Sequence, residues 1–235
     1  MSIRIGIISA MEREVAPFVA GWNSVRLQST PLAIRTDLAR ETAYVASGIG
    51  REPGIAATEA LVAEFNPDVL VSAGFAGALI SERKIADEIQ AGIVVDGATG
   101  ESFRTEASSS SRIVSSGFIA NRNDKLGLHS RFQAEAVDME GAAVATVAQR
   151  HRIPFYAVKT ISDELDFPML PFAEFVDSQG RFRIVGFLAH VGLRPGHWPG
   201  LIRMGTNSAK AAAKLNSALR QLTSDIRQSR VVSVS

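Results

Sequence analysis

Two apolar stretches that each lead to a carboxylate constrain the fold of this chain more than any other feature. Residues 153–166 (IPFYAVKTISDELD) have the pattern of a buried strand that ends in Ser162 and Asp163. Residues 136–143 (AVDMEGAA) are a short apolar strand that turns into a helix near Glu140. Ligands bind outside the carboxyl ends of strands in open α/β sheets. The two stretches therefore predict a binding site at one edge of a sheet.

The rest of the chain alternates between strand and helix patterns. Apolar, β-branched runs predict strands at residues 3–9, 42–47, 69–73, 92–96, 113–116, 134–138 and 154–161. Helical patterns occupy residues 11–19, 53–65, 139–151, 171–191 and 200–227. This alternation is typical of an α/β protein in which helices cover both faces of the sheet. We predict a single-domain three-layer α/β/α fold over residues 1–235, with a mixed, mostly parallel central sheet.

Composition limits the possible functions. The 235 residues are 46% hydrophobic with a net charge of +1, which gives ample core and no overall attraction to nucleic acid. Cysteine is absent, which rules out disulfides, thiol catalysis and cysteine metal sites, and the four histidines have no ligand spacing. The N-terminal apolar run is too short to span a membrane and lacks the features of a signal peptide. We expect a cytoplasmic protein without a metal or organic cofactor.

The C-terminal tail, residues 192–235, carries seven basic residues and one acidic residue. Its first residues, 192–200, are a predicted Pro/Gly hinge between the predicted helices at 171–191 and 200–227. This end of the chain is compatible with two packed helices that have a solvated basic face. In a second hypothesis, the tail forms a wide apolar opening, or mouth, that admits a bulky hydrophobic group or rests on an anionic membrane surface. The apolar residues of that mouth would be Phe187, Leu188, Trp198, Leu201 and Ile202, with Arg194 and Arg203 at its rim.

Acidic residues stand at three predicted strand ends. Glu12 and Glu14 open the first helix, Glu140 opens another, and Asp163 follows a strand. Each one alone is explained by a helix dipole or an N-cap. Together they predict a site, because clustering like charges is costly unless the chemistry needs them.

Two glycine-rich segments follow strands. Gly48, Gly50 and Gly54 miss the dinucleotide-binding fingerprint by one position, so a tight turn near a sugar is favoured over a nicotinamide-dependent oxidoreductase. Residues 74–77 (GFAG) predict a turn that lets the backbone approach a ligand closely.

Six segments taken in order carry a family resemblance: IGIISAMEREV, SGIG, SAGFAGAL, GFIAN, AVDMEGAAVA and AVKTISD. They are similar in order and spacing to the 5′-methylthioadenosine/S-adenosylhomocysteine nucleosidases and their nucleoside phosphorylase relatives. The tail after residue 166 resembles that of hopanoid-associated phosphorylases. The resemblance implies cleavage of a purine N-glycosidic bond, in a 5′-substituted adenosine, through an oxocarbenium-like state.

The resemblance also implies roles for single residues. Asp163 would protonate the purine at N7, and Glu14 would take a proton from the attacking water. Ser162 would orient Asp163. Glu140 and Met139 would contact the ribose, and Phe118 and Ile119 the purine. Ile49, Gly74 and Phe75, in the glycine-rich segments, are the remaining implied substrate contacts. A carboxylate can accept a proton from water, and nearby carboxylates stabilise positive charge developing on the sugar.

Hydrolysis and phosphorolysis remain alternatives. Phosphorylases of this type hold phosphate with arginines. The corresponding positions hold Glu14 and Ser72 here, which favours water, although Arg13 is adjacent. The alternative is phosphorolysis of an adenosyl-lipid-like substrate, with phosphate as co-substrate.

Two departures from the nucleosidases leave a third possibility. Phe75 stands where they usually have serine, and the segment from residue 96 to 118 is shorter than theirs. A non-catalytic nucleoside-binding protein is therefore a further hypothesis. The resemblance also implies a homodimer or a higher homo-oligomer.

Overall fold

The computed structural model describes residues 2–27, 32–168 and 198–232. Within them, eleven strands form one sheet. The strands are β1 (Ile5–Ser9), β2 (Asn23–Arg26), β3 (Ala33–Thr36), β4 (Thr42–Ala46), β5 (Val69–Ala78), β6 (Glu88–Ala91), β7 (Ile93–Asp96), β8 (Ser102–Arg104), β9 (Arg112–Ser115), β10 (Ala136–Asp138) and β11 (Phe155–Asp163). The helices are α1 (Glu12–Val15), α2 (Arg51–Phe65), α3 (Arg122–Phe132), α4 (Gly141–His151) and α6 (Trp198–Val232).

The sheet is mixed, as predicted. Strands β4, β1, β5 and β11 pair in parallel, and so do β10, β9 and β7. The two groups are joined by an antiparallel contact between β5 and β10. The antiparallel strands β2, β3, β6 and β8 extend the sheet. The sheet thus has five parallel and five antiparallel strand pairings. The parallel pairings bring together the strands that lead to the predicted site.

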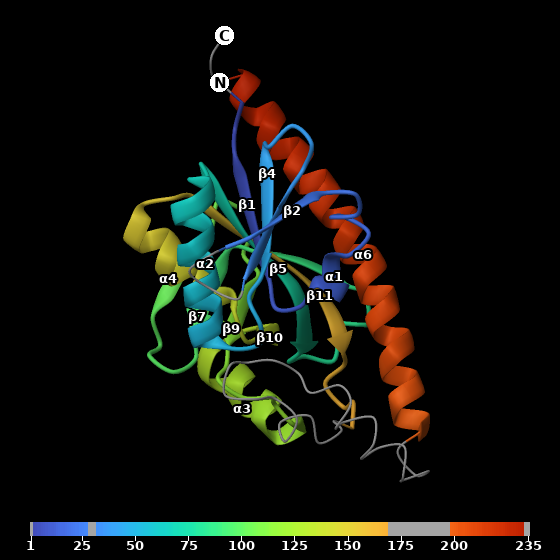
Figure 1. Ribbon diagram of the computed structural model, residues 1–235. Coiled ribbons are helices and arrows are strands. Elements are labelled where there is room, and N and C mark those ends of the chain that lie inside the picture. The colour runs from blue at the N-terminus through green and yellow to red at the C-terminus, as the bar shows by residue number, and fades with distance from the viewer. Residues whose placement is uncertain (1, 28–31, 169–197, 233–235) are drawn as a thin grey trace.

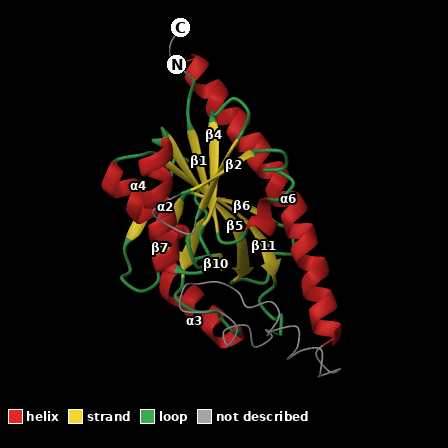
Figure 2. Cartoon of the chain, in the orientation of Figure 1, coloured by secondary structure: helices red, strands yellow, loops and turns green. Residues whose placement is uncertain are grey.

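Helices cover both faces of the sheet, which gives the predicted three layers (Figures 1 and 2). One face packs against α2 and α4 and includes Leu61 and Val147. The other face packs against α1 and the long helix α6, which contributes Leu215, Leu219 and other residues at helical spacing. Helix α3 closes a smaller cluster beside β10. The carboxyl ends of β5 and β11 lie between α3 and the N-terminal half of α6 (Figure 1).

Strand β5 is longer than expected. The predicted turn at residues 74–77 is wrong, because β5 continues to Ala78. Strand β11 runs beside it and pairs Lys159 with Gly74 and Asp163 with Gly77, so the glycines keep hydrogen-bonding partners in the sheet. The glycine-rich sequence therefore marks a close approach within a strand and not a chain reversal.

The first helix is shorter than expected. Residues 11–19 were predicted as a helix, but α1 ends at Val15. Pro17 lacks an amide hydrogen and its ring crowds the preceding turn, which opposes continuation of the helix. Strands β2, β3, β6 and β8 and helix α3 were not predicted, because their segments are polar or too short to show a clear period.

The C-terminal helix is longer than expected. Helix α6 begins at Trp198, so residues 198–200 belong to a helix and not to the predicted hinge. The rest of that hinge and the predicted helix at 171–191 lie outside the described residues, as do Phe187, Leu188 and Arg194. Ile202 is exposed, and Arg203 lies over the ring of Phe167 at 5.8 Å.

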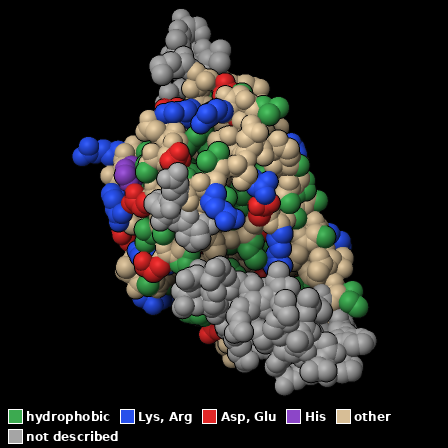
Figure 3. All heavy atoms as spheres, viewed as in Figure 1, with side chains coloured by type: hydrophobic (Ala, Val, Ile, Leu, Met, Phe, Trp, Pro, Cys, Tyr) green, Lys and Arg blue, Asp and Glu red, His purple; other side chains and the backbone are tan. Residues whose placement is uncertain are grey.

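Several basic residues of α6 have partners within the chain. Arg227 reaches Asp37 at 3.4 Å and Thr42 at 2.7 Å, Lys214 pairs with Glu88 at 3.0 Å, and Arg220 donates to the carbonyl of Pro17. On the face seen in Figure 3, the coloured basic and acidic side chains are interspersed. The part of the basic tail that the structure describes is thus accounted for largely by docking of α6 onto the sheet. Among the described residues, no helix has the length and apolar character needed to cross a bilayer.

Candidate active site

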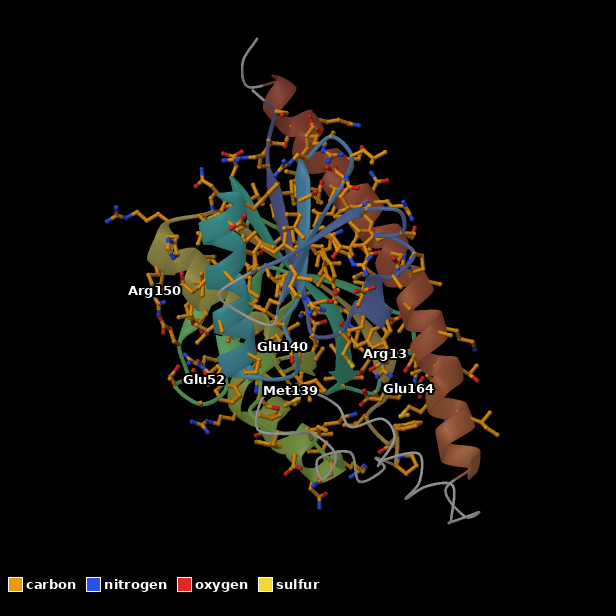
Figure 4. All side chains as sticks on the ribbon, viewed as in Figure 1. Arg13, Glu52, Met139, Glu140, Arg150 and Glu164 are labelled. Carbon is orange, nitrogen blue, oxygen red and sulfur yellow. The ribbon has the colours of Figure 1, made fainter. Side chains whose placement is uncertain are left out.

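A cavity of about 560 Å³ opens at the carboxyl ends of the central strands. Its volume is within the usual range for a small-molecule site. Nine of the ten predicted site residues line it, namely Glu14, Ile49, Phe75, Phe118, Ile119, Met139, Glu140, Ser162 and Asp163. Figure 4 places Arg13, Met139, Glu140 and Glu164 around this end of the sheet, whereas Arg150 projects from the outer surface of α4. Residues more than 140 positions apart in the chain therefore meet in one cavity.

Gly74 is the exception, because it does not line the cavity. It lies behind Glu14, where a Cβ atom would be 3.3 Å from Glu14 Oε2, and its φ of +151° favours glycine. Gly74 is therefore placed to leave room for the Glu14 carboxyl group. This role differs from the substrate contact that was predicted for Gly74.

The structure distinguishes the two acidic residues of α1. Glu12 is about half exposed and pairs with Arg35 at 2.7 Å. Glu14 is only 3% exposed, and the backbone amide of Met11 donates to its Oε2 at 3.4 Å. Burial raises the pKa of Glu14 to about 7, although Lys159 opposes the shift. A carboxyl group with this pKa can exchange a proton near neutral pH, as a general base must.

Glu140 occupies the N-cap position of α4, and its side chain accepts a hydrogen bond from the backbone amide of Gly50 at 2.8 Å. Burial and the negative charge of Asp138 raise the pKa of Glu140 to about 8, with Lys159 acting in the opposite direction. Glu140 lines the cavity next to Met139, as expected for a residue that binds ribose hydroxyls.

A buried lysine that the sequence analysis did not single out connects these acidic groups. The Nζ atom of Lys159 lies 2.7 Å from Asp138 Oδ2 and donates to Ser72 Oγ at 2.9 Å. Asp138 also accepts hydrogen bonds from Ser115 Oγ and the amide of Gly141. A buried charge needs such partners. Lys159 thus compensates part of the negative charge that Glu14 and Glu140 would add to the cavity.

The second predicted catalytic carboxylate, Asp163, has two close partners. Ser162 Oγ donates to Asp163 Oδ1 at 2.9 Å, which agrees with the orienting role that the resemblance implies for Ser162. Lys125 Nζ lies 2.5 Å from Oδ2 and also donates to the carbonyl of Glu164 at 2.8 Å. Lys125 lies on α3, and its side chain is 2% exposed. This ion pair was not predicted.

Apolar side chains form much of the remaining wall. Phe118 lines the cavity and is 50% exposed, which leaves its ring accessible to a planar ligand. Phe75 and Met139 line the cavity, and Phe75 packs against the hydrophobic core between the sheet and helices α1 and α6. Helix α6 contributes Met204, Gly205, Ser208, Ala209 and Ala212. These residues, mostly small, leave space at this end of the cavity.

The histidines and acidic residues do not form a metal centre in the described part of the chain. No group of three or more potential ligands comes together there. His151 pairs with Glu59 and His129 contacts the carbonyl of Ala134. His190 and His197 lie outside the described residues.

The missed residues carry a signal in the sequence. Lys159 and Asp138 interrupt otherwise apolar strands, and buried charges are rare unless they are paired. Lys125 shares an apolar helical stripe with Leu128 and Phe132, at spacings of three and seven. A charge within an apolar pattern thus indicates a buried ion pair, although its partner cannot be identified without the fold.

Comparisons with known proteins agree with this architecture. An aminodeoxyfutalosine nucleosidase of Helicobacter pylori is 26% identical over 199 residues, which cover 69% of this chain and 86% of the relative. A 5′-methylthioadenosine/S-adenosylhomocysteine nucleosidase of Shewanella loihica is 25% identical over 199 residues, which cover 68% and 86%.

Solved structures show the same fold. A 5′-methylthioadenosine/S-adenosylhomocysteine nucleosidase of Helicobacter pylori, complexed with a substituted pyrrolidin-3-ol, superposes with a TM-score of 0.72 at 20% identity. The match covers 95% of this chain and 99% of that chain. An S-adenosylhomocysteine nucleosidase of Streptococcus pyogenes, in complex with 5-methylthiotubericidin, gives a TM-score of 0.69 at 19% identity, covering 93% and 94%.

The family profile of the phosphorylase superfamily matches residues 4–105 and 98–183. The expected resemblance of the tail to hopanoid-associated phosphorylases stays a prediction, because the family match ends at residue 183. The matched segments contain all ten predicted site residues and most of the cavity wall, and together they span well over half of the sequence. On this evidence the chain belongs to the phosphorylase superfamily, which includes the nucleoside phosphorylases and nucleosidases.

Proposed function

We propose that this protein hydrolyses the N-glycosidic bond of an adenosine-type nucleoside, with a substituent at the 5′ position. The observation that carries the proposal is the presence of Glu14 and Asp163 in one cavity, with Glu140 and Met139 in its wall. The sequence relatives named above support it, because their names describe nucleosidases. The space along α6 is suited to a 5′ substituent.

In the proposed reaction, the bond between C1′ and purine N9 breaks and its electron pair goes to the purine, which is protonated at N7 on the Asp163 side. Glu14 accepts a proton from water, and the water oxygen bonds to C1′. Glu140 binds the ribose hydroxyls, while Phe118 stacks on the purine and the backbone at Ile119 contacts its edge. Carboxylates near the sugar stabilise its developing positive charge. All these groups come from the chain, so the proposal needs no metal or organic cofactor.

Phosphorolysis is the second candidate. Arg13 lines the cavity and Lys159 lies beside Glu14, so cations are present near the acceptor position. Two observations oppose phosphate. The carboxyl group of Glu14 would repel it, and Ser72, at a position where phosphorylases carry arginine, is buried and already bonded to Lys159. Phosphate is a co-substrate only in this alternative.

The test is an assay of base release. Purified protein is incubated with methylthioadenosine, S-adenosylhomocysteine, adenosine and inosine, with and without phosphate, and the products are separated by chromatography. Release of adenine and a free sugar without phosphate supports hydrolysis. Release only with phosphate, giving a sugar 1-phosphate, contradicts it in favour of phosphorolysis. Binding without release, measured by calorimetry, indicates a non-catalytic nucleoside-binding protein.

The quaternary structure and location are part of the same proposal. We expect a homodimer or a higher homo-oligomer in the cytoplasm, and light scattering of the purified protein tests the first of these. Contact of the basic tail with a membrane remains a hypothesis, and flotation with anionic vesicles tests it.

A further inference from the structure

The ion pair between Lys125 and Asp163 conflicts with a simple role for Asp163 as the acid. A general acid must carry a proton when the leaving group departs. An ammonium group 2.5 Å from a carboxylate oxygen favours the ionised carboxylate. The second oxygen of Asp163 accepts a hydrogen bond from Ser162, which also stabilises the negative charge. In this arrangement the Lys125 ammonium group is the closest proton donor to Asp163.

The pair is held tightly where the purine is expected. Both residues line the cavity, and Lys125 is 1% exposed. A Cβ atom at Gly77 would lie 2.8 Å from Asp163 Oδ2 and 3.2 Å from Lys125 Cε, so only glycine leaves room for the pair. Bulk water has little access to this lysine, whereas the Asp163 side chain is 17% exposed and faces the cavity.

Other charged groups at this end of the cavity are more exposed. Arg122 pairs with Asp166 at 2.5 Å, and Lys84 lies 4.0 Å from Glu164. Exposed pairs are screened by water and contribute little. Among the described residues, Lys125 is the basic residue that forms an ion pair with Asp163.

We propose that Lys125 supplies the proton that the purine leaving group receives, and that Asp163 relays it. As the C1′–N9 bond breaks, the Lys125 ammonium transfers a proton to Asp163, and Asp163 transfers a proton to purine N7. The lysine becomes a neutral amine and the carboxylate is regenerated. After the purine leaves, Asp163, whose side chain is 17% exposed, takes up a proton from solvent and passes it to the Lys125 amine. Glu14 releases to solvent the proton it took from water. The net reaction is nucleoside plus water giving sugar plus purine. This inference rests on the proposed function.

The competing explanation is structural. Lys125 also donates to the carbonyl of Glu164, so it fixes the backbone that follows β11. A lysine that only positions Asp163 would be replaceable by arginine, which keeps the charge and the donors. Arginine does not release its proton in proteins. The leaving group provides the second distinction, because p-nitrophenolate leaves without protonation.

The experiment compares two substrates: the purine nucleoside that the wild type cleaves, and the p-nitrophenyl riboside with the same 5′ group. For Lys125→Met we expect the purine kcat to fall by about 10²–10⁴-fold, the range typical of general acid catalysis. The p-nitrophenyl kcat should change by less than about 10-fold. Lys125→Arg should lose purine cleavage to a similar extent. The double variant Asp163→Asn/Lys125→Met should lose no more purine activity than Lys125→Met alone.

Lys84→Met, at an exposed pair nearby, is the matched control and should match the wild type on both substrates.

The pH profile gives an independent readout. Without Lys125, Asp163 must take its proton from solvent, so purine cleavage by Lys125→Met should recover as the pH is lowered. Equal losses on both substrates, or full purine activity in Lys125→Arg, would overturn the proposal. If Lys125→Met does not fold, Lys125→Arg decides the question. A wild type that cleaves no nucleoside would instead refute the proposed function, and this inference with it.

Discussion

The buried carboxyl group of Glu14 must lose its proton before it can accept one from water. Because burial raises its pKa to about 7, kcat/KM should increase about tenfold per pH unit below that value and level off above it. Glu14→Gln should reduce kcat by about 10²–10⁴-fold at pH 8, since the amide cannot act as a base. Steady-state assays from pH 5 to 9 test both expectations. Glu12→Gln is the control, because Glu12 lies outside the cavity; a similar loss there would contradict the assignment.

The half-exposed ring of Phe118 offers a stacking surface to the purine. Stacking of a base on an aromatic side chain is worth about 1–3 kcal/mol. Phe118→Ala should therefore raise KM by roughly 5- to 150-fold, with a smaller effect on kcat. Leu38→Ala is the control, because it removes an apolar side chain that is 83% exposed and does not line the cavity, so KM should not change. An unchanged KM in Phe118→Ala would place the purine elsewhere.

Gly77 of β5 leaves the space in which Asp163 of β11 meets Lys125 of α3. In Gly77→Ala, the new methyl group would meet Asp163 Oδ2 at 2.8 Å, so the carboxylate must move. We expect a loss of activity of at least about 10-fold and a destabilisation of about 1–3 kcal/mol, as overpacking usually costs.

The control for this change is Gly127→Ala on α3, where a Cβ atom meets nothing within 4 Å. Alanine replaces glycine in an open helical position there and should stabilise the protein by about 0.5–1 kcal/mol. Urea unfolding followed by circular dichroism measures both variants. Equal stability and activity of Gly77→Ala and the wild type would show that the strand tolerates the methyl group.

The stability of the whole molecule should depend on pH through its buried acids. Below about pH 4.5 Glu14 is protonated in both the folded and the unfolded protein, so it contributes no pH dependence. As the pH rises from 4.5 to about 7, the unfolded state loses the proton while the folded state keeps it, and stability falls. The loss is on the order of 3 kcal/mol for Glu14 and is complete above its folded pKa. Glu140, with a pKa of about 8, acts in the same direction.

Thermal unfolding should therefore show a lower Tm at pH 8.5 than at pH 5.5. Glu14→Gln and Glu140→Gln should each reduce this difference, because the amide removes the need to bury a charge. Activity and stability would then change in opposite directions in Glu14→Gln at high pH. A wild-type Tm that rises over this interval would mean that other groups dominate.

Much of the site could be predicted from the sequence, because its residues follow apolar strands. The patterns around Glu140 and Asp163 indicated carboxylates at one edge of a sheet, and their resemblance to a family identified Glu14 in preference to Glu12. Nine of ten predicted residues line the cavity, although their chemical roles are still predictions. Gly74 was assigned to the substrate because residues 74–77 were predicted as a turn, whereas they continue β5.

The sequence by itself determined the order of the strands that pair in parallel, namely β1, β4, β5, β7, β9, β10 and β11, since apolar periodicity and strand-end residues are local properties. Only the tertiary structure decided which charges meet. Lys125 and Asp163 are 38 positions apart, and Lys159 joins Asp138 across two strands that do not pair with each other. The length of β5 depended on β11, which supplies its hydrogen bonds. The same packing excludes water from Glu14 and Glu140, and this burial, which no local pattern encodes, moves their pKa values towards neutrality.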